Sequence, residues 1–193
     1  METVILKDSI TNRMNDNEFF RFCLENKNLR IERNSNLEII IMSPTSSFSG
    51  KINTEVIRQL SNWNIHEKRG EVFDSSTGFT LPDRSVFSPD ASWVSNEKWN
   101  KLTDEQKNSF APLCPEFIIE IRSKSDSSSE MHSKMNQWMK NSCHLGWLID
   151  PINKEVHIYK QGTLPEVISG FKRPIQADNP VEGFLLDLSF LII

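Results

Sequence analysis

The acidic residue Glu120 lies inside an otherwise apolar segment, residues 117–121, whose sequence is FIIEI. Such near-continuous hydrophobicity is typical of a strand that is covered on both faces of a sheet, where an isolated carboxylate is strongly destabilising. Glu120 therefore needs compensation. A basic partner would give the acid a structural role, whereas a divalent cation shared with a second acid would give it a catalytic role.

A second acid, Asp90, stands thirty residues earlier in the sequence Ser88-Pro89-Asp90, at the start of the strand-like segment 88–94. Because side chains alternate along a strand, Asp90 occupies one face of this segment, and Glu120 shares a face of its own strand with Arg122. If the two strands pair, the carboxylates can meet. Mg²⁺ is commonly held by one or two carboxylates together with substrate phosphate and water, so this pair favours metal-assisted phosphodiester hydrolysis.

A helix expected from residue 126 or 130 to residue 142 supplies a candidate ammonium group. Its inward stripe consists of residues at helical spacing, Met131, Met135, Trp138 and Ser142. Lys134 lies at the edge of this stripe, from which a lysine can extend along the core and place its charged end at the end of the sheet. There it would orient water or offset charge on a phosphate. A solvated lysine on the helix flank is the alternative that the same periodicity allows.

The elements that must position these residues follow from hydrophobic periodicity and turn signals. Helices are expected at 16–26, 46–67 and 126 or 130–142, with a weaker one within 96–109. Strands are expected at 29–33, 37–42, 71–77, 79–81, 88–94, 117–122, 145–149 and 155–159. Since helices lie between the strands and no repeat or low-complexity linker occurs, the sequence predicts one α/β domain, residues 1–193, with a mixed, twisted sheet.

Composition limits the classes of function. The chain has 193 residues and a net charge of −4, and its basic residues are scattered rather than gathered into a stripe typical of nucleic-acid binding. A groove beside clustered carboxylates can still be locally basic. The three cysteines are widely spaced, as expected for reduced thiols, and neither a zinc-binding nor a serine-hydrolase motif occurs. With no apolar leader and no long apolar run, we expect a soluble, cytoplasmic protein without a membrane segment.

Seven short segments stand out by their order and spacing: 29–32 (LRIE), 42–45 (MSPT), 73–82 (FDSSTGFTLP), 88–94 (SPDASWV), 115–127 (PEFIIEIRSKSDS), 145–151 (LGWLIDP) and 182–188 (EGFLLDL). Each segment alone carries little information. Together they extend over nearly the whole chain and resemble the Uma-two family of restriction-endonuclease-like proteins.

This resemblance implies the fold of the PD-(D/E)xK nuclease superfamily, a mixed β-sheet flanked by α-helices, with metal bound at the sheet. Asp90 and Glu120 would be the ligands of Mg²⁺ or Mn²⁺, and Glu32 matches an early acid that is often close to such sites. The resemblance also implies DNA as the partner and a homodimer that cuts both strands. From its alternation with Ile31 and Arg33 alone, Glu32 could equally be an exposed acid on a hairpin.

The lysine of the superfamily pattern is not at its expected place, because Arg122 stands two residues after Glu120. Arginine stays protonated and cannot act as a general base, although it can clamp a phosphate or pair with Glu120. The resemblance points instead to Lys134, with Lys124 as a lesser candidate.

Two functions follow. One is an Mg²⁺-dependent endodeoxyribonuclease with Asp90, Glu120, Lys134, Arg122 and Glu32 at its site. The other is a non-catalytic nucleic-acid-binding or assembly protein that retains the nuclease fold.

Overall fold

The computed structural model describes residues 3–6 and 14–192. Its larger sheet has the strand order β11-β10-β9-β8-β7-β4. These strands are β4 (Gly70–Asp74), β7 (Ala91–Ser95), β8 (Phe117–Ile121), β9 (Leu145–Asp150), β10 (Glu155–Lys160) and β11 (Glu166–Ser169). β8 and β9 run parallel, whereas every other neighbouring pair is antiparallel, so the sheet is mixed as the sequence predicted.

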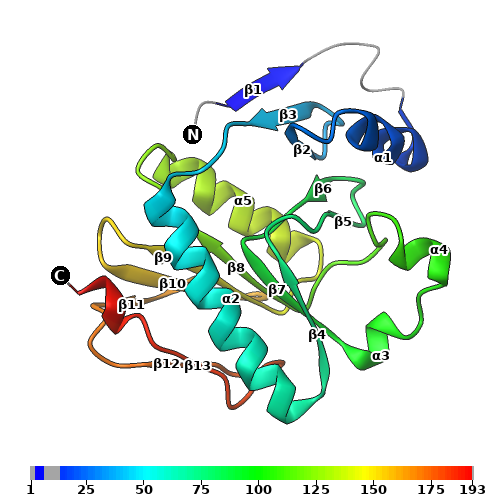
Figure 1. The fold of residues 1–193 in the computed structure, drawn as a ribbon. Helices are drawn as coiled ribbons and strands as arrows, with labels where there is room; N and C mark the ends of the chain where they lie inside the picture. Colours follow the sequence, from blue (N-terminus) through cyan, green and yellow to red (C-terminus); the bar gives the residue numbers. More distant parts are fainter. Residues whose placement is uncertain (1–2, 7–13, 193) are drawn as a thin grey trace.

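Two long helices, α2 (Ser47–Glu67) and α5 (Ser128–Lys140), cover opposite faces of this sheet (Figure 1). Alternation along β8 divides the core between them. Ile119 and Ile121 belong to the cluster that contains the buried residues of α2, whereas Ile118 packs with Met135 and Trp138 of α5. Glu120 alternates with Ile119 and Ile121, and its side chain therefore points to the α5 side of the sheet.

The C-terminal end of α5 differs from the prediction. The helix ends at Lys140, and Ser142, which follows it, has a positive φ of 73° and is exposed. The placement of Ser142 in the inward stripe was therefore wrong, because the chain turns away before the next helical turn is complete. The stripe itself is confirmed at Met135 and Trp138, both fully buried.

A smaller sheet forms the upper layer in Figure 1, with the strand order β1-β3-β2-β6-β5. Its strands are β1 (Thr3–Leu6), β2 (Arg30–Arg33), β3 (Ile39–Met42), β5 (Phe79–Thr80) and β6 (Val86–Phe87). Helix α1 (Asp16–Glu25) packs on it through a small cluster around Phe19. β5 and β6 also contribute Phe79 and Phe87 to the core beneath α5, so the two layers share apolar contacts.

The remaining elements are short. They are α3 (Asn96–Trp99), α4 (Asp104–Lys107), β12 (Ile175–Gln176), β13 (Leu185–Leu186) and the 3₁₀ turn η2 (Ser189–Leu191). The polar segment 96–109 thus holds two single-turn helices where the sequence predicted one weak helix. None of the helices within residues 3–6 and 14–192 is long and apolar enough to cross a bilayer.

Candidate active site

Glu120 lies in β8, and Asp90 is the residue directly before the neighbouring strand β7, which starts at Ala91 and not at Ser88 as predicted. β7 and β8 are antiparallel with Ala91 opposite Ile119, and continuing this register places Asp90 opposite Glu120. The backbone fixes Asp90 firmly, because its Oδ2 accepts a hydrogen bond from the Ile121 N–H at 2.8 Å and its carbonyl accepts one from Asn53 of α2 at 2.9 Å. The structure thus brings together the two acids that strand alternation had placed within reach of each other.

Lys134 supplies a basic partner of Glu120. Its Nζ lies 3.0 Å from Glu120 Oε1, and the Trp138 Nε1–H donates a hydrogen bond to the same oxygen at 2.9 Å. Both partners stand on α5, one helical turn apart, which explains how a helix over the sheet holds a buried carboxylate in a fixed orientation. The Lys134 side chain is 19% exposed and so is not the solvated lysine of the alternative prediction.

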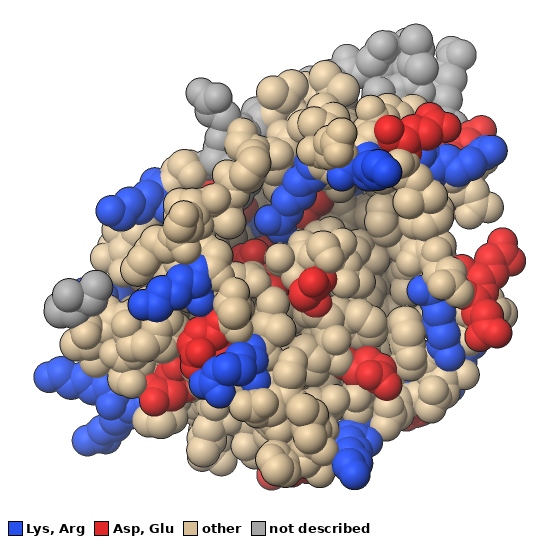
Figure 2. Space-filling view, viewed as in Figure 1, with Lys and Arg blue, Asp and Glu red and all other residues tan. Residues whose placement is uncertain are grey.

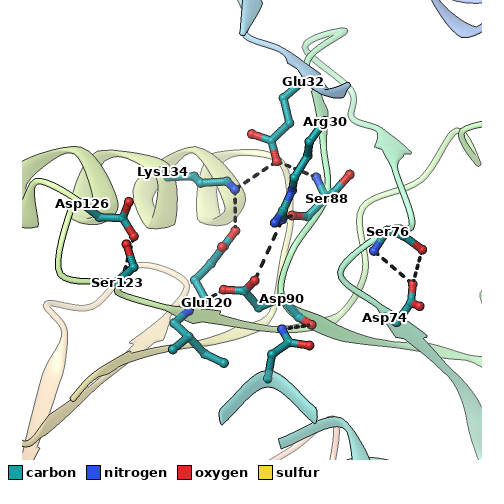
Figure 3. Close-up of polar contacts among 12 residues, drawn as sticks. Arg30, Glu32, Asp74, Ser76, Ser88, Asp90, Glu120, Ser123, Asp126 and Lys134 are labelled. Carbon is teal, nitrogen blue, oxygen red and sulfur yellow. Dashed lines mark hydrogen bonds and ion pairs between the residues drawn. The ribbon is translucent and has the colours of Figure 1, made fainter. Parts of the chain in front are cut away.

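Glu32 enters this cluster from the smaller sheet. Its Oε1 accepts hydrogen bonds from Lys134 Nζ at 3.1 Å and from the Ser88 N–H at 3.0 Å (Figure 3). The residue is 3% exposed, so the reading of Glu32 as an exposed hairpin acid was wrong. β6 pairs with β2 in the same sheet, and Ser88, which directly follows β6, thereby reaches the Glu32 carboxylate. Lys134 consequently bridges an acid of each sheet.

Arg30 is a member of the cluster that the sequence analysis missed. Its Nη2 lies 3.9 Å from Asp90 Oδ1, and Figure 3 shows its side chain between Asp90 and Ser88. A signal for it was present, because Arg30 and Glu32 are two residues apart on one strand and therefore share a face.

Arg122 and Lys124 lie outside the cluster. Arg122 does not pair with Glu120, because its guanidinium donates to Asp150 Oδ2 at 2.8 Å and to the Asp126 carbonyl at 3.3 Å. The register of β8 and β9 accounts for this, since Glu120 faces Leu148 and Arg122 therefore comes next to Asp150. Lys124 is exposed in the segment that follows β8.

The cluster opens into a cavity of about 620 Å³ between the two sheets and the first turns of α2 and α5. The charged residues that line it are Arg30, Glu32, Asp90, Glu120, Asp126, Glu130 and Lys134. Figure 2 shows acidic and basic side chains side by side in this hollow below the upper layer. Cations of the protein thus lie beside the acids, although the chain as a whole is acidic.

Burial alters the charge states in the cavity. It raises the pKa of Glu120 to about 7, with the charge of Lys134 opposing this shift and the charge of Asp90 adding to it. Burial likewise raises the pKa of Asp90, against the charge of Arg30. Burial alone would lower the pKa of Lys134, but the charges of Glu120, Glu32 and Asp90 raise it above its usual value. Lys134 is therefore a charged ammonium at neutral pH.

The donor set fits a hard divalent cation. Asp90, directly before β7, and Glu120, in the adjacent β8, offer carboxylate oxygens, and Mg²⁺ prefers such ligands with water and phosphate completing its shell. The described part of the chain contains no group of three or more His, Cys, Asp or Glu side chains arranged to hold a metal ion by themselves. Two carboxylates facing an open cavity suit a site that substrate and water complete.

Comparisons with known proteins identify the family and the fold. A family model, Uma2, described as "Putative restriction endonuclease", matches residues 16–189. A crystal structure from Anabaena variabilis ATCC 29413, described as a "putative nuclease belonging to DUF820", is similar with a TM-score of 0.69 and 20% sequence identity. The similarity covers 83% of this chain and 88% of that one, and at this identity it shows a shared fold. A search of curated proteins found no match.

Proposed function

The chain belongs to the Uma2 family, and from this premise we propose that it is a metal-dependent endonuclease that hydrolyses phosphodiester bonds of DNA. The observation that carries the proposal is the placement of Asp90 opposite Glu120 in an open cavity, with the Lys134 ammonium 3.0 Å from Glu120 Oε1. Phosphoryl chemistry depends mainly on positioning and on charge stabilisation, and this cluster supplies both.

In this proposal, Asp90 and Glu120 hold Mg²⁺ or Mn²⁺. When bound, the cation supplies Lewis acidity toward the phosphate and activates the attacking water. Lys134 keeps its proton, because the surrounding acids raise its pKa, and it therefore acts as a hydrogen-bond donor and a positive charge rather than as a general base. Glu32 is a positioning residue, since it holds the Lys134 ammonium from the side of the smaller sheet.

The direct test compares cleavage of supercoiled and linear DNA in Mg²⁺, Mn²⁺ and EDTA. We expect metal-dependent cleavage that falls by at least about a hundredfold in Asp90→Asn, Glu120→Gln and Lys134→Ala, because each change removes charge at the site. Asp74→Asn is the matched control, since Asp74 is an acid in a turn, bonded to Ser76, and does not line the cavity. Cleavage that survives all three site substitutions would contradict the proposal.

A non-catalytic binding or assembly protein with the nuclease fold is the second candidate. One observation favours it: Lys134 and Arg30 already lie beside the acids, so the charges are partly compensated without a metal. Retained DNA binding without metal-dependent cleavage or metal binding would select this function.

We further propose that residues 1–193 form one domain, that the protein acts as a homodimer so that two sites reach both strands, and that it works in the cytoplasm. Sedimentation equilibrium with and without duplex DNA tests the dimer. A monomer in both conditions would contradict it.

A further inference from the structure

The guanidinium of Arg30 is poorly satisfied for a side chain that is only 31% exposed. Within the described residues, its Nη2 lies 3.5 Å from the Ser88 carbonyl and 3.9 Å from Asp90 Oδ1, and its Nε is buried without a hydrogen-bond partner. Good N–H···O distances are about 2.7–3.2 Å, and a buried donor without a partner is destabilising. Most of the five donors of Arg30 therefore have no good acceptor among the described residues.

Arg33, on the same strand, shows what a structural arginine looks like in this fold. Its guanidinium is fully buried, contacts Asp16 Oδ1 at 2.5 Å and donates to the Arg84 carbonyl at 2.8 and 3.1 Å. The guanidinium of Arg33 thus has good hydrogen-bond partners, whereas that of Arg30, three residues earlier, does not. Arg33 shows that this strand can hold a guanidinium with good hydrogen bonds. The loose contacts of Arg30 therefore point to a ligand from outside the chain as its missing acceptor.

Arg30 also stands at a boundary between two hollows. It lines the main cavity, and it lines a second hollow of about 420 Å³ together with Lys27, Ser75, Ser76 and Ser88. Ser75 also lines both hollows, so a chain molecule that occupied the two together would lie beside Arg30 and Ser75. The planar fork of arginine matches the oxygens of a phosphate, and the two cations and three hydroxyls near this path suit a polyanion.

We propose that Arg30 binds a phosphate of the substrate strand next to the cleavage position, and that Asp90 restrains Arg30 until a divalent cation binds Asp90. This inference rests on the proposed function, because it assigns a subsite to the same cavity. Among the described residues, Asp90 is the acid that forms an ion pair with Arg30. A cation at Asp90 competes with Arg30 for the same negative charge, and the guanidinium then turns toward the phosphate.

Competition between Arg30 and the cation for Asp90 predicts how the metal affinity and the oligonucleotide affinity change when Arg30 is replaced. If Arg30 only stabilised the fold, its replacement would weaken or leave unchanged both metal binding and nucleic-acid binding. If Arg30 competes with the cation and binds phosphate, its replacement changes the two affinities in opposite directions. Metal should bind more tightly, and the oligonucleotide should bind more weakly.

The experiment uses Arg30→Gln and Arg30→Lys in the full chain, with Arg58→Gln as the control. Arg58 is an exposed arginine on α2 that pairs with Glu55 and lines neither hollow. Mn²⁺ affinity is measured without DNA. Binding of a fluorescein-labelled oligonucleotide with cleavage-resistant phosphorothioate linkages is measured by anisotropy in saturating Mn²⁺ over a range of salt concentrations. A parallel titration in EDTA is the metal-free comparison, in which Asp90 still restrains Arg30 and the substitution should matter less. Thermal unfolding confirms that each variant is folded.

For Arg30→Gln we expect Mn²⁺ to bind several-fold more tightly and the oligonucleotide to bind roughly tenfold more weakly, with the log–log salt slope reduced by about one. Arg30→Lys should keep the salt slope but lose part of the affinity, because it retains the charge without the planar fork. Arg58→Gln should match the wild type.

Two results would overturn the inference. In the first, the wild type binds Mn²⁺ and cleaves DNA, but Arg30→Gln leaves the oligonucleotide affinity and the salt slope unchanged. The proposed function would then stand, and only the role of Arg30 would be contradicted. Metal and oligonucleotide affinities that fall together would likewise assign Arg30 to the fold. If the wild type neither binds Mn²⁺ nor cleaves DNA, the proposed function fails first and the inference falls with it.

Discussion

Asp90 carries a negative charge that its burial disfavours, since burial raises its pKa above the ordinary value. Asp90→Asn removes the charge, while the new amide oxygen can still accept the hydrogen bond from the Ile121 N–H. A raised pKa of an acid means that stability is lost as the pH rises through that pKa. We therefore expect metal-free Asp90→Asn to be more stable than the wild type by on the order of 1 kcal/mol near pH 8, with the difference shrinking toward acid pH.

Urea unfolding with and without Mn²⁺ measures this effect. At about a hundredfold its dissociation constant, Mn²⁺ should stabilise the wild type by about 2.7 kcal/mol and Asp90→Asn by far less. Asp74→Asn should respond to metal as the wild type does. Equal stabilities of wild type and Asp90→Asn in both conditions would be incompatible with a metal site at Asp90.

The pKa of Glu120, raised by burial to about 7, predicts that metal affinity depends on pH. Below that value Glu120 is mostly protonated and must release its proton before it can bind a cation. Mn²⁺ affinity should fall as the pH drops below 7, approaching about tenfold for each pH unit, and should level off above it. Calorimetric titration across this range is the measurement. Glu120→Gln should bind weakly at every pH, and a flat wild-type profile would exclude Glu120 as a ligand.

Lys134 offsets two buried acids, and its loss should affect stability as well as activity. Lys134→Met leaves Glu32 and Glu120 without their shared cation, which should cost about 3 kcal/mol near neutral pH. The loss should diminish as the pH falls, because Glu120, whose pKa is raised by burial, can then protonate. Urea unfolding tests this, with Lys101→Met as the control, since Lys101 is an exposed lysine paired with Glu97.

Adding Glu120→Gln to Lys134→Met should recover part of the stability, because one of the two unpaired charges is gone. A double variant no more stable than Lys134→Met would show that the destabilisation comes from lost packing instead.

The sequence predicted the residues of this cluster unevenly, for reasons that lie in strand pairing. Asp90 and Glu120 could be placed because alternation along each strand is a local property. Glu32 was named from the family resemblance, but alternation could not predict its burial, which depends on β6 lying beside β2, a contact between distant segments. Arg30 was missed, although it shares a face of β2 with Glu32. Arg122 was expected near Glu120, but the parallel register with β9 gave it Asp150 as a partner.

At the scale of elements, two glycines show how closely the strands beneath the site pack. A Cβ on Gly70 would lie 2.3 Å from the Val94 carbonyl oxygen and 2.5 Å from the Trp93 ring, whereas a Cβ on Gly50 of α2 would meet nothing within 4 Å. Gly70→Ala should therefore force β4 from β7 and destabilise the protein by about 2 kcal/mol or more. Gly50→Ala should stabilise it by about 0.5–1 kcal/mol through helix propensity.

Thermal and urea unfolding of the two variants form a matched comparison of the same chemical change. Gly70→Ala should also reduce cleavage, because β7 begins directly after Asp90 and shifts with β4. A destabilised Gly70→Ala protein with full activity would show that the Asp90 position does not depend on the β4–β7 pairing.

The long helices followed from the sequence, whereas the short strands did so only in part. α2, with apolar residues at steps of three and four, was predicted within one residue at its start, where the Ser46 side chain accepts a hydrogen bond from the Ser49 N–H. Among strands of two to four residues, β2, β3 and β5 lie within predicted strands, whereas β1, β6, β11, β12 and β13 were missed, because such short strands carry little periodicity. Such short strands form only where a neighbouring strand from elsewhere in the fold is in place to pair with them.

For the whole molecule, the position of the site between two sheets links catalysis to the integrity of the fold. Glu32 and Arg30 come from the smaller sheet, Asp90 and Glu120 from the larger sheet or its edge, and Lys134 from α5. The layers are also joined by apolar packing, since Phe79 and Phe87 share a cluster with Trp138. A cavity built in this way keeps its geometry only while both layers are folded and in contact.

This shared core predicts that the chain unfolds as one cooperative unit. The five tryptophans, Trp63, Trp93, Trp99, Trp138 and Trp147, all lie outside α1 and strands β1 to β3, so their fluorescence reports on the rest of the molecule, whereas far-UV circular dichroism reports on both layers. Urea transitions followed by the two probes should coincide. Saturating Mn²⁺ should shift both midpoints equally, because the metal binds only the assembled cavity. A separate circular-dichroism transition without a change in fluorescence would mean that the smaller sheet and α1 unfold alone, and the site would then lose Glu32 and Arg30 before the larger sheet unfolds.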